Sequence, residues 1–269
     1  MIEPNSIING NCLVVMEEIE DESIDMILCD PPYGSTQNNW DIVIPPDKMW
    51  EQYKRIIKEN GAILIFGQGM FTAKMIMSNP EMFRYNIIWD KVLKSGFLNA
   101  NRMPLRQHED IMVFYKKAPT YNPQLTHGSP NHSKGSADGR NSNEIHSNRN
   151  YGNYVVKDST GDMKYPSSIW TFQRTHPRSA IHATEKPVSL LRYAIRTYTN
   201  PGELVLDNCC GSGSTLIAAK AERRYYIGID NGICDKKSSP YYGLPWVEVA
   251  KRRLMKIDEE NLENFENND

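Results

Sequence analysis

Apolar clusters alternate with segments of helical periodicity over most of this chain, and that alternation restricts the fold more than any single motif does. Buried strands separated by amphipathic helices are typical of α/β proteins, in which helices cover both faces of a mostly parallel sheet. Strands are expected at residues 23–29, 62–66, 85–89, 111–115, 203–206 and 225–229, and helices at 47–59, 71–77, 186–198, 215–222 and 246–257. The pattern predicts an α/β fold with a single doubly wound, Rossmann-like sheet.

Length and composition agree with this fold class. The 269 residues suffice for one large domain, or for a core domain with a smaller insert, and 39% of them are apolar. No apolar run approaches the length needed to span a bilayer, and the first residues lack the basic and then apolar layout of a signal peptide. The five cysteines form no Cys-x-x-Cys pair, so neither disulfides nor a zinc site is expected. These features predict a cytoplasmic protein with no metal and no membrane partner.

Residues 118–178 differ in composition from the rest, being rich in Asn, Ser, Gly, His and Pro and poor in aliphatic side chains. A stretch of this length is too long for an ordinary loop of a compact domain, so it is either functional or disordered. The formal net charge of the chain is −2, yet residues 116–182 contain nine Lys and Arg against four Asp and Glu. The positive excess is either a footprint for phosphate groups or the charge of a solvated loop.

A glycine-rich turn opens with Asp207, directly after an expected strand, and leads through Gly211 and Gly213 into an expected helix. This is the opening of a nucleotide-binding βαβ unit, in which glycines let a ligand approach the backbone. Asp230 stands nineteen residues after Gly211, the spacing of an acid that binds ribose hydroxyls. Leu216 replaces the third glycine of the dinucleotide fingerprint, which favours S-adenosylmethionine over NAD. A tight packing turn without a ligand is the alternative.

The tetrapeptide Asp30-Pro31-Pro32-Tyr33 stands at the carboxyl end of an expected buried strand. Its two prolines fix φ and remove two backbone donors, so the turn presents the Asp30 carboxylate and the Pro31 carbonyl, all of them acceptors. Such acceptors hold the N–H groups of an amino group and stabilise the positive charge that its nitrogen gains on reaction with an electrophile. Tyr33 offers an aromatic face to a base drawn out of its stack. A chance double proline in a turn is the alternative, and the position at a strand's carboxyl end argues against it.

Four segments in a fixed order resemble the amino-group DNA methyltransferases of the permuted beta group, Asp-Pro-Pro-Tyr type. Residues 9–12 resemble the Gly-Asp-Cys element near the cofactor's adenine, 30–34 the catalytic motif, 182–188 the His-x-Thr-x-Lys-Pro element and 207–215 the glycine turn. In this group the catalytic motif comes first, a target-recognition region follows, and the cofactor turn comes last. The order of the four segments is therefore more specific than any of them alone.

The resemblance implies S-adenosylmethionine as the cofactor and a defined set of site residues. The catalytic ones are Asp30, Pro31, Pro32 and Tyr33. The cofactor-binding ones are Asn11, Cys12, Asp30, Lys186, Asp207, Cys209, Cys210, Gly211, Ser212, Gly213, Ser214, Thr215, Asp230 and Asn231, with Lys186 near the methionine end. Two departures affect this set: Asn11 stands where Asp is usual, and Asn208-Cys209-Cys210 stands where Pro-Phe-Ala is usual, so an aromatic ring that would shield the sulfonium is missing.

The resemblance further implies direct methyl transfer to an exocyclic amino group of a base flipped out of double-stranded DNA, with no covalent role for a cysteine. In the family, Asp at the first motif position goes mostly with adenine N6 and Ser with cytosine N4, so Asp30 favours adenine N6. Cytosine N4, or an amino group of RNA or protein, is the alternative target. An inactive DNA-binding protein and an NAD-linked dehydrogenase explain the motifs less well.

DNA contacts are expected from Trp40, Arg102, Lys134, Arg140 and Arg149. A partly buried loop anchor is the alternative for Trp40, and simple solvation is the alternative for Arg102. His108-Glu109 resembles another family element, with structural orientation and catalysis as its two candidate roles.

The expected domains are a catalytic half at residues 1–117, a target-recognition insert at 118–180 and a cofactor-binding half at 181–269. Besides DNA, a second copy of the chain and a cognate restriction endonuclease are candidate partners. The resemblance places the protein in a bacterial cytoplasm, encoded by the host or by a phage.

Overall fold

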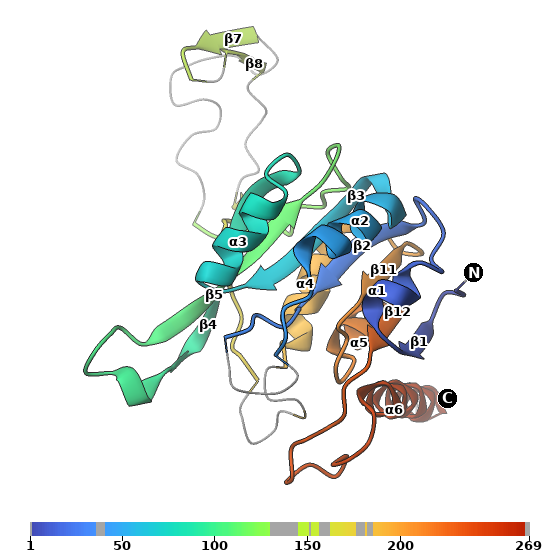
Figure 1. Cartoon of the computed structure of the whole chain (residues 1–269). Helices are drawn as coiled ribbons and strands as arrows, with labels where there is room; N and C mark the ends of the chain where they lie inside the picture. The colour runs from blue at the N-terminus through green and yellow to red at the C-terminus, as the bar shows by residue number, and fades with distance from the viewer. Residues whose placement is uncertain are drawn as a thin grey trace. The chain divides into compact units, whose positions relative to one another are not determined.

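The computed structural model describes residues 2–35, 41–129, 145–150, 152–155, 162–175, 181 and 185–266. Within these residues, eight strands form one sheet in the order β1-β12-β11-β2-β3-β5-β4-β10 (Figure 1). In that order their bounds are Ser6–Asn9, Tyr225–Asp230, Leu204–Asp207, Ile24–Cys29, Ile57–Gly67, Arg106–Phe114, Phe83–Ser95 and Ile169–Thr171. Strand β5 pairs antiparallel with β3 and β4, and the other pairs are parallel, which confirms a mostly parallel sheet.

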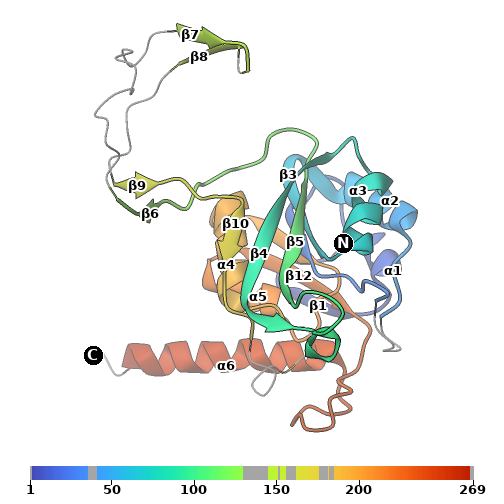
Figure 2. The same ribbon diagram turned by 90° about the vertical axis from the view of Figure 1, so that its left-hand side faces the viewer.

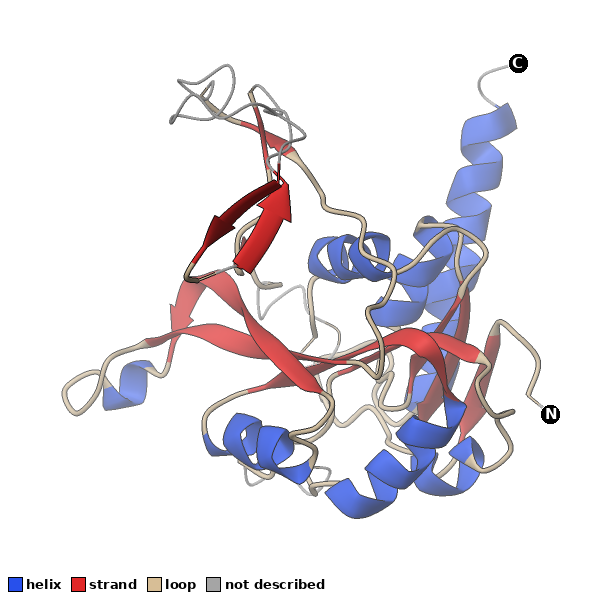
Figure 3. Cartoon of the chain, turned by 90° about the horizontal axis from the view of Figure 1, so that it is seen from above, coloured by secondary structure: helices blue, strands red, loops and turns tan. Residues whose placement is uncertain are grey.

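Helices cover both faces of this sheet (Figure 2 and Figure 3). Their bounds are Cys12–Met16 for α1, Pro46–Ile56 for α2, Met70–Ser78 for α3, Val188–Tyr198 for α4, Ser214–Ala221 for α5 and Trp246–Glu266 for α6. The first three share one hydrophobic core with the sheet, and the last three share another. The doubly wound α/β fold is thereby confirmed. None of the helices formed by the described residues combines the length and the apolar character that a bilayer crossing requires.

Strand β2 shows how the sequence produces these two cores. It lies between β11 and β3 and runs parallel to both. Met26 and Leu28 point into the core that α4 and α5 cover, whereas Ile27 and Cys29 point into the core that α2 and α3 cover. Because both faces are buried, the strand is an almost continuous apolar run rather than an alternating one. Its carboxyl end delivers Asp30.

The junction between α2 and β3 differs from the expected helix at 47–59 and strand at 62–66. Helix α2 ends at Ile56, and Ile57 is already extended and pairs with Ile24 of β2. Lys58 then forms an ion pair with Asp25 of β2 at 2.6 Å. The apolar pair at 56 and 57 continues the helical pattern, but pairing with the neighbouring strand decides where the helix ends.

Strands β4 and β5 are longer than the expected 85–89 and 111–115. They continue as a hairpin that pairs as far as Ser95 and Arg106, and a 3₁₀ turn, η1 (Phe97–Asn99), lies at its tip (Figure 1 and Figure 3). Apart from the buried Lys91, the added strand residues are half-buried or exposed, so no apolar pattern marks them in the sequence.

Pro123–Ser167 form a separate compact unit. Its described residues make two antiparallel pairs: β6 (Thr126–His127) with β9 (Met163–Lys164), and β7 (Ile145–Asn148) with β8 (Gly152–Val155). The unit is shorter than the expected insert of 118–180. The difference at its carboxyl side arises because β10 belongs to the large sheet, where it runs parallel to β4.

Candidate active site and cofactor pocket

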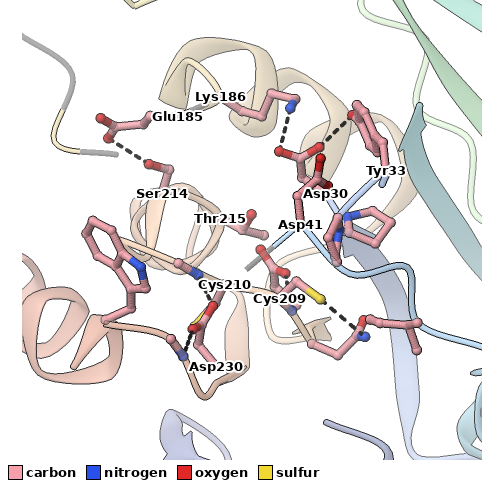
Figure 4. Close-up of a pocket in the computed structure, with 18 of the residues that line it drawn as sticks. Asp30, Tyr33, Asp41, Glu185, Lys186, Cys209, Cys210, Ser214, Thr215 and Asp230 are labelled. Carbon is pink, nitrogen blue, oxygen red and sulfur yellow. Dashed lines mark hydrogen bonds and ion pairs between the residues drawn. The ribbon is translucent and has the colours of Figure 1, made fainter. Parts of the chain in front are cut away.

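Two turns that lie far apart in the sequence meet at one edge of the sheet. Strands β2 and β11 are parallel neighbours, with Met26 opposite Val205 and Ile27 opposite Leu206, so the turns that follow them leave the sheet side by side. A cavity of about 760 Å³ is lined by both turns, residues 30–33 and 207–212 (Figure 4). Doubly wound sheets bind their ligands at this edge, outside the carboxyl ends of the strands.

Asp30 is held by two neighbours. Its Oδ1 accepts a hydrogen bond from the Tyr33 hydroxyl at 2.7 Å, and its Oδ2 accepts one from the Lys186 ammonium at 2.5 Å (Figure 4). Burial, reinforced by the charge of Asp30, raises the pKa of Tyr33 well above its ordinary value, so the hydroxyl stays protonated and donates. The Tyr33 ring stacks on Phe71 at a centroid distance of 4.9 Å. The carboxylate is thereby fixed at the cavity wall.

Lys186 is itself part of a buried chain of charges. Its ammonium lies 3.4 Å from Oε2 of Glu109, whose Oε1 lies 3.0 Å from the ammonium of Lys91. Burial opposes the charge of Lys186, but Asp30 and Glu109 more than offset it and raise the lysine's pKa. Burial likewise opposes the charge of Glu109, but the two lysines more than offset it and lower the pKa of that carboxyl. Two carboxylates and two ammonium groups therefore alternate in this cluster, and its net charge is zero when all four are ionised.

The carboxylate of Asp230 is held by backbone amides of both turns around it. Its Oδ2 accepts from the amide of Gly211 at 2.8 Å, and its Oδ1 accepts from that of Gly232 at 2.7 Å (Figure 4). Both bonds hold the carboxylate on the cavity wall, at the carboxyl end of β12.

The two glycines of the turn have different surroundings. Both have positive φ, +48° at Gly211 and +83° at Gly213. A Cβ at Gly213 would lie 2.7 Å from the Cβ of Ala250 on α6, so the packing of this helix leaves no room for a side chain at Gly213. At Gly211, which lines the cavity, no atom of the described residues lies within 4 Å of a Cβ position. Only Gly211 therefore leaves room beside a bound ligand.

Asp207 is a buried acid on the cavity wall. Burial raises its pKa from 3.8 to about 7, although hydrogen bonds with Thr215 and with the amide of Cys209 act in the opposite direction. The bond from Cys209 joins its backbone nitrogen to Oδ1 of Asp207 at 3.0 Å. Asp207 therefore changes its charge near neutral pH.

Three thiols gather where the family usually has an aromatic ring. Interactions with the thiols of Cys12 and Cys29, together with burial, raise the pKa of Cys209 well above its ordinary value. The bond with Cys209, aided by Asn208 and opposed by burial, lowers the pKa of Cys12 to about 7. Asn208, where the family has proline, accepts a hydrogen bond from the Tyr53 hydroxyl at 2.5 Å. All five cysteines are free thiols.

The cavity brings together most of the residues that the resemblance singles out. Those on its wall are Asn11, Cys12, Asp30, Pro31, Pro32, Tyr33, Lys186, Asp207, Cys209, Cys210, Gly211, Ser212, Ser214, Thr215, Asp230 and Asn231. Gly213 is not among them, because it packs on α6. Lys186, expected at the methionine end of the cofactor, lies on this wall and contacts Asp30.

Two of the five expected DNA-binding residues, Arg102 and Arg149, lie within the described part of the chain. Arg102 is exposed in the loop between β4 and β5, and Arg149 is exposed between β7 and β8 in the smaller unit. Trp40, Lys134 and Arg140 lie outside the described residues. Among the described residues, no group of three or more His, Cys, Asp or Glu is placed to hold a metal ion.

Sequence reasoning missed several residues of the cavity wall, among them Lys91, Arg174 and Trp246. Lys91 stands in a mostly apolar strand, and a lysine there is a signal in itself, since lysines are rarely buried unless paired. Arg174 and Trp246 follow an edge strand and a long irregular segment, where no motif draws attention to them.

A doubly wound sheet whose cavity joins a glycine turn, a ribose-type acid and a double-proline acceptor turn defines an enzyme that uses a nucleoside cofactor. The sequence model of the family described as DNA methylase matches residues 24–235 of the chain. The chain therefore belongs to the DNA methylase family, which confirms the resemblance.

Individual relatives agree with this family. The type II methyltransferase M.HinfI of Haemophilus influenzae is 25% identical over 94% of this chain and 69% of its own length. The DNA adenine methyltransferase YhdJ of Escherichia coli is 26% identical over 85% of this chain and 79% of its own. Among solved structures, the M1.HpyAVI–SAM complex superposes with a TM-score of 0.57 at 20% identity, covering 92% of this chain and 98% of that one, which shows a shared fold.

Proposed function

We propose that this protein transfers the methyl group of S-adenosylmethionine to N6 of adenine in a specific sequence of double-stranded DNA, after flipping the base out of the helix. One observation carries the proposal: the acceptor turn at residues 30–33 and the glycine turn after β11 line the same cavity, although they stand at opposite ends of the chain. Membership of the DNA methylase family supports the reaction class and the DNA substrate.

The donor set of the cavity fits S-adenosylmethionine. Asp230 lies on the cavity wall at the end of β12, the position of an acid that binds ribose hydroxyls. The sulfonium and the ammonium of this cofactor are both positive, and the wall also carries the acids Asp30, Asp207 and Glu185. The open position beside Gly211 leaves space for the ligand. The solved structure of M1.HpyAVI, which shares the fold, is a complex with SAM.

Bound S-adenosylmethionine supplies an electrophilic methyl group. The chain's own residues orient the amino group that receives it: the Asp30 carboxylate and the Pro31 carbonyl accept its N–H groups. As the nitrogen becomes positive, the Asp30 carboxylate stabilises it, and its oxygens are the first acceptors for the proton that the nitrogen releases. Tyr33 and Lys186 already hold this carboxylate, so little reorganisation accompanies the reaction.

Two observations support adenine as the target base. Asp30 is the residue that usually accompanies adenine N6 in the family, and one relative, YhdJ, is named a DNA adenine methyltransferase. Cytosine N4 and an amino group of RNA or protein are the alternatives that the experiment below separates.

The remaining expectations belong to the same proposal. The insert at 118–180, between the halves at 1–117 and 181–269, is the region that recognises the target sequence, with Arg149 among its DNA contacts. A bacterial cytoplasm, a homodimer and a cognate restriction endonuclease are proposed from the family. The type II relatives support the endonuclease, since such enzymes act in restriction–modification systems.

The test is incubation with radiolabelled S-adenosylmethionine and mixed-sequence duplex DNA, followed by nucleoside analysis. Label in N6-methyladenine is the expected result, label in N4-methylcytosine would correct the base, and label confined to RNA or protein would refute the DNA substrate. Asp30→Ala is expected to abolish transfer while cofactor binding stays measurable. Asp47→Asn, an exposed acid of α2, is the matched control and is expected to keep full activity.

A further inference from the structure

The tip of the β4–β5 hairpin, residues 92–106, carries large apolar side chains that are exposed to water. Leu98 is fully exposed, Phe97 is 67% exposed and Met103 is 56% exposed. Single exposed apolar side chains are common, but three close together in the sequence of one hairpin, which protrudes from the sheet (Figure 1), are typical of an interaction site.

Backbone hydrogen bonds hold the tip in one shape. Gly96, at φ +88°, opens the 3₁₀ turn, and its carbonyl accepts from the amide of Asn99 at 2.9 Å. The carbonyl of Asn99 in turn accepts from the amides of Arg102 at 2.9 Å and Met103 at 3.0 Å. A surface that is ordered before it binds loses less conformational entropy on binding than a flexible loop does.

A strained residue marks the point where the tip leaves the sheet. Val92 has φ +63°, a conformation that a β-branched residue rarely adopts. Asp90 holds it there by accepting from the Val92 amide at 2.9 Å and from the Gln107 side chain at 3.0 Å. The register of β4 against β5 shifts within the same segment, between Asp90 and Ser95. Backbone strain of this kind persists mainly where a function requires the geometry.

The charge of the tip indicates its partner. Residues 92–107 contain the basic side chains of Lys94, Arg102 and Arg106 and no acidic one. An apolar wedge flanked by lysine and arginine is the chemistry by which proteins enter duplex DNA, where the cations bind phosphates and the wedge separates bases.

The tip is continuous with the cavity. Ser95 and Arg106, which pair at its base, both line the cavity wall. Arg106 also donates to the side chain of Gln68, another wall residue, at 3.1 Å. A duplex that places a base in the cavity therefore passes next to the tip.

We infer that the tip inserts Leu98 into the DNA duplex at the target site and occupies the space that the flipped base leaves. The inference rests on the proposed function. A base that is flipped out loses its stacking contacts, and an apolar side chain in the vacated space of the duplex restores part of them. Leu98 is the candidate because it is the most exposed large apolar residue of the tip, and Phe97 and Met103 would cover the neighbouring bases.

The experiment uses a duplex that contains the methylated sequence, identified first by sequencing DNA modified by the wild-type protein, with 2-aminopurine at the target position. The fluorescence of 2-aminopurine rises when the base leaves the stack. Leu98→Ala is expected to lower both the fluorescence gain and the affinity for this duplex by about tenfold, since it removes most of a leucine side chain that becomes buried in the complex. Met77→Ala, which truncates a similarly exposed residue of α3, is the matched control and is expected to behave as wild type.

A second duplex, with an abasic site opposite the target, separates insertion from a general loss of binding. Its target base is already unpaired, so Leu98→Ala is expected to regain most of the wild-type affinity. Equal behaviour of Leu98→Ala and Met77→Ala on the paired duplex would overturn the inference while leaving the proposed function intact. A conversion of dimer to monomer by Leu98→Ala, with flipping unchanged, would also overturn it, because the tip would then cover a second copy. Absence of DNA methylation by the wild type would refute the proposed function itself.

Discussion

Replacement of Gly213 by alanine separates two demands on the glycine turn, the packing of α6 and the approach of the cofactor. At φ +83° an alanine costs about 1–2 kcal/mol relative to glycine. Its Cβ would lie 2.7 Å from the Cβ and 3.1 Å from the Cα of Ala250. Carbon atoms prefer a separation of about 3.5–4.0 Å, so α6 must shift by about 1 Å. Overpacking of this kind costs about 1–3 kcal/mol, which gives a total of about 2–5 kcal/mol.

The measurement is equilibrium unfolding in urea, compared with Gly202→Ala. Gly202 has a similar φ of +85°, and no atom of the described residues lies within 4 Å of its Cβ position. That variant is therefore expected to lose only the conformational part, about 1–2 kcal/mol. An equal loss of unfolding free energy in the two variants would show that the contact with Ala250 does not exclude a side chain at Gly213, and the packing argument would be wrong.

Gly211→Ala completes the comparison. Its Cβ meets open space on the cavity wall, so the loss of stability is expected to stay near 1–2 kcal/mol. The same Cβ stands where the cofactor is proposed to bind, and the affinity for S-adenosylmethionine, measured by calorimetry, is expected to fall by about tenfold or more. Folded Gly213→Ala is expected to keep more of its affinity than Gly211→Ala, and the reverse order would contradict the roles assigned to the two glycines.

Three further predictions concern the charged and thiol groups of the cavity. Lys186→Met leaves the acids around it without their shared partner and is expected to cost about 3–5 kcal/mol in urea unfolding, as breaking a buried ion pair does; a loss below about 1 kcal/mol would show that the pair is effectively solvated. Because the pKa of Asp207 is about 7 in the fold and 3.8 is its ordinary value, the folded state binds the proton more tightly, and stability falls as pH rises between these values. Asp207→Asn is expected to lack that part of the fall, and identical pH profiles of the two proteins would contradict the shift. Cys12, with its pKa lowered to about 7, is expected to react with iodoacetamide faster than the other cysteines at pH 7, as read by peptide mass spectrometry, and preferential labelling of Cys234 would contradict this.

Much of the fold and site can be predicted from the sequence because the signals are local. The almost continuous apolar run of β2 requires burial on both faces, and this predicts a parallel sheet with helices on both sides. Parallel strands end at the same edge, so acidic and glycine-rich turns that follow strands are expected to share a ligand site. This reasoning predicts Asp30, Gly211 and Asp230 as site residues, and all three line the cavity.

The ends of the helices and strands are harder to predict from the sequence than their existence. Ile57 ends helix α2 because it pairs with Ile24, and the apolar pattern does not distinguish that strand pairing from another turn of helix. The outer parts of β4 and β5 pair with each other, largely in solvent, so apolar alternation does not mark them. Their hairpin, with Leu98 at its tip, is visible only once the two strands are placed side by side.

The sequence by itself determined the class of fold, the order of its motifs and the acids and glycines at the strand ends, because each depends on residues close together in the chain. Only the tertiary structure decided which partners these residues have. Lys186 meets Asp30 and Glu109 because α4, β2 and β5 converge at the cavity. Ala250 leaves no room for a side chain at Gly213 because α6 packs there, whereas the space beside Gly211 is open. Contacts between distant segments depend on which strands and helices become neighbours, and the local pattern of a sequence does not specify that.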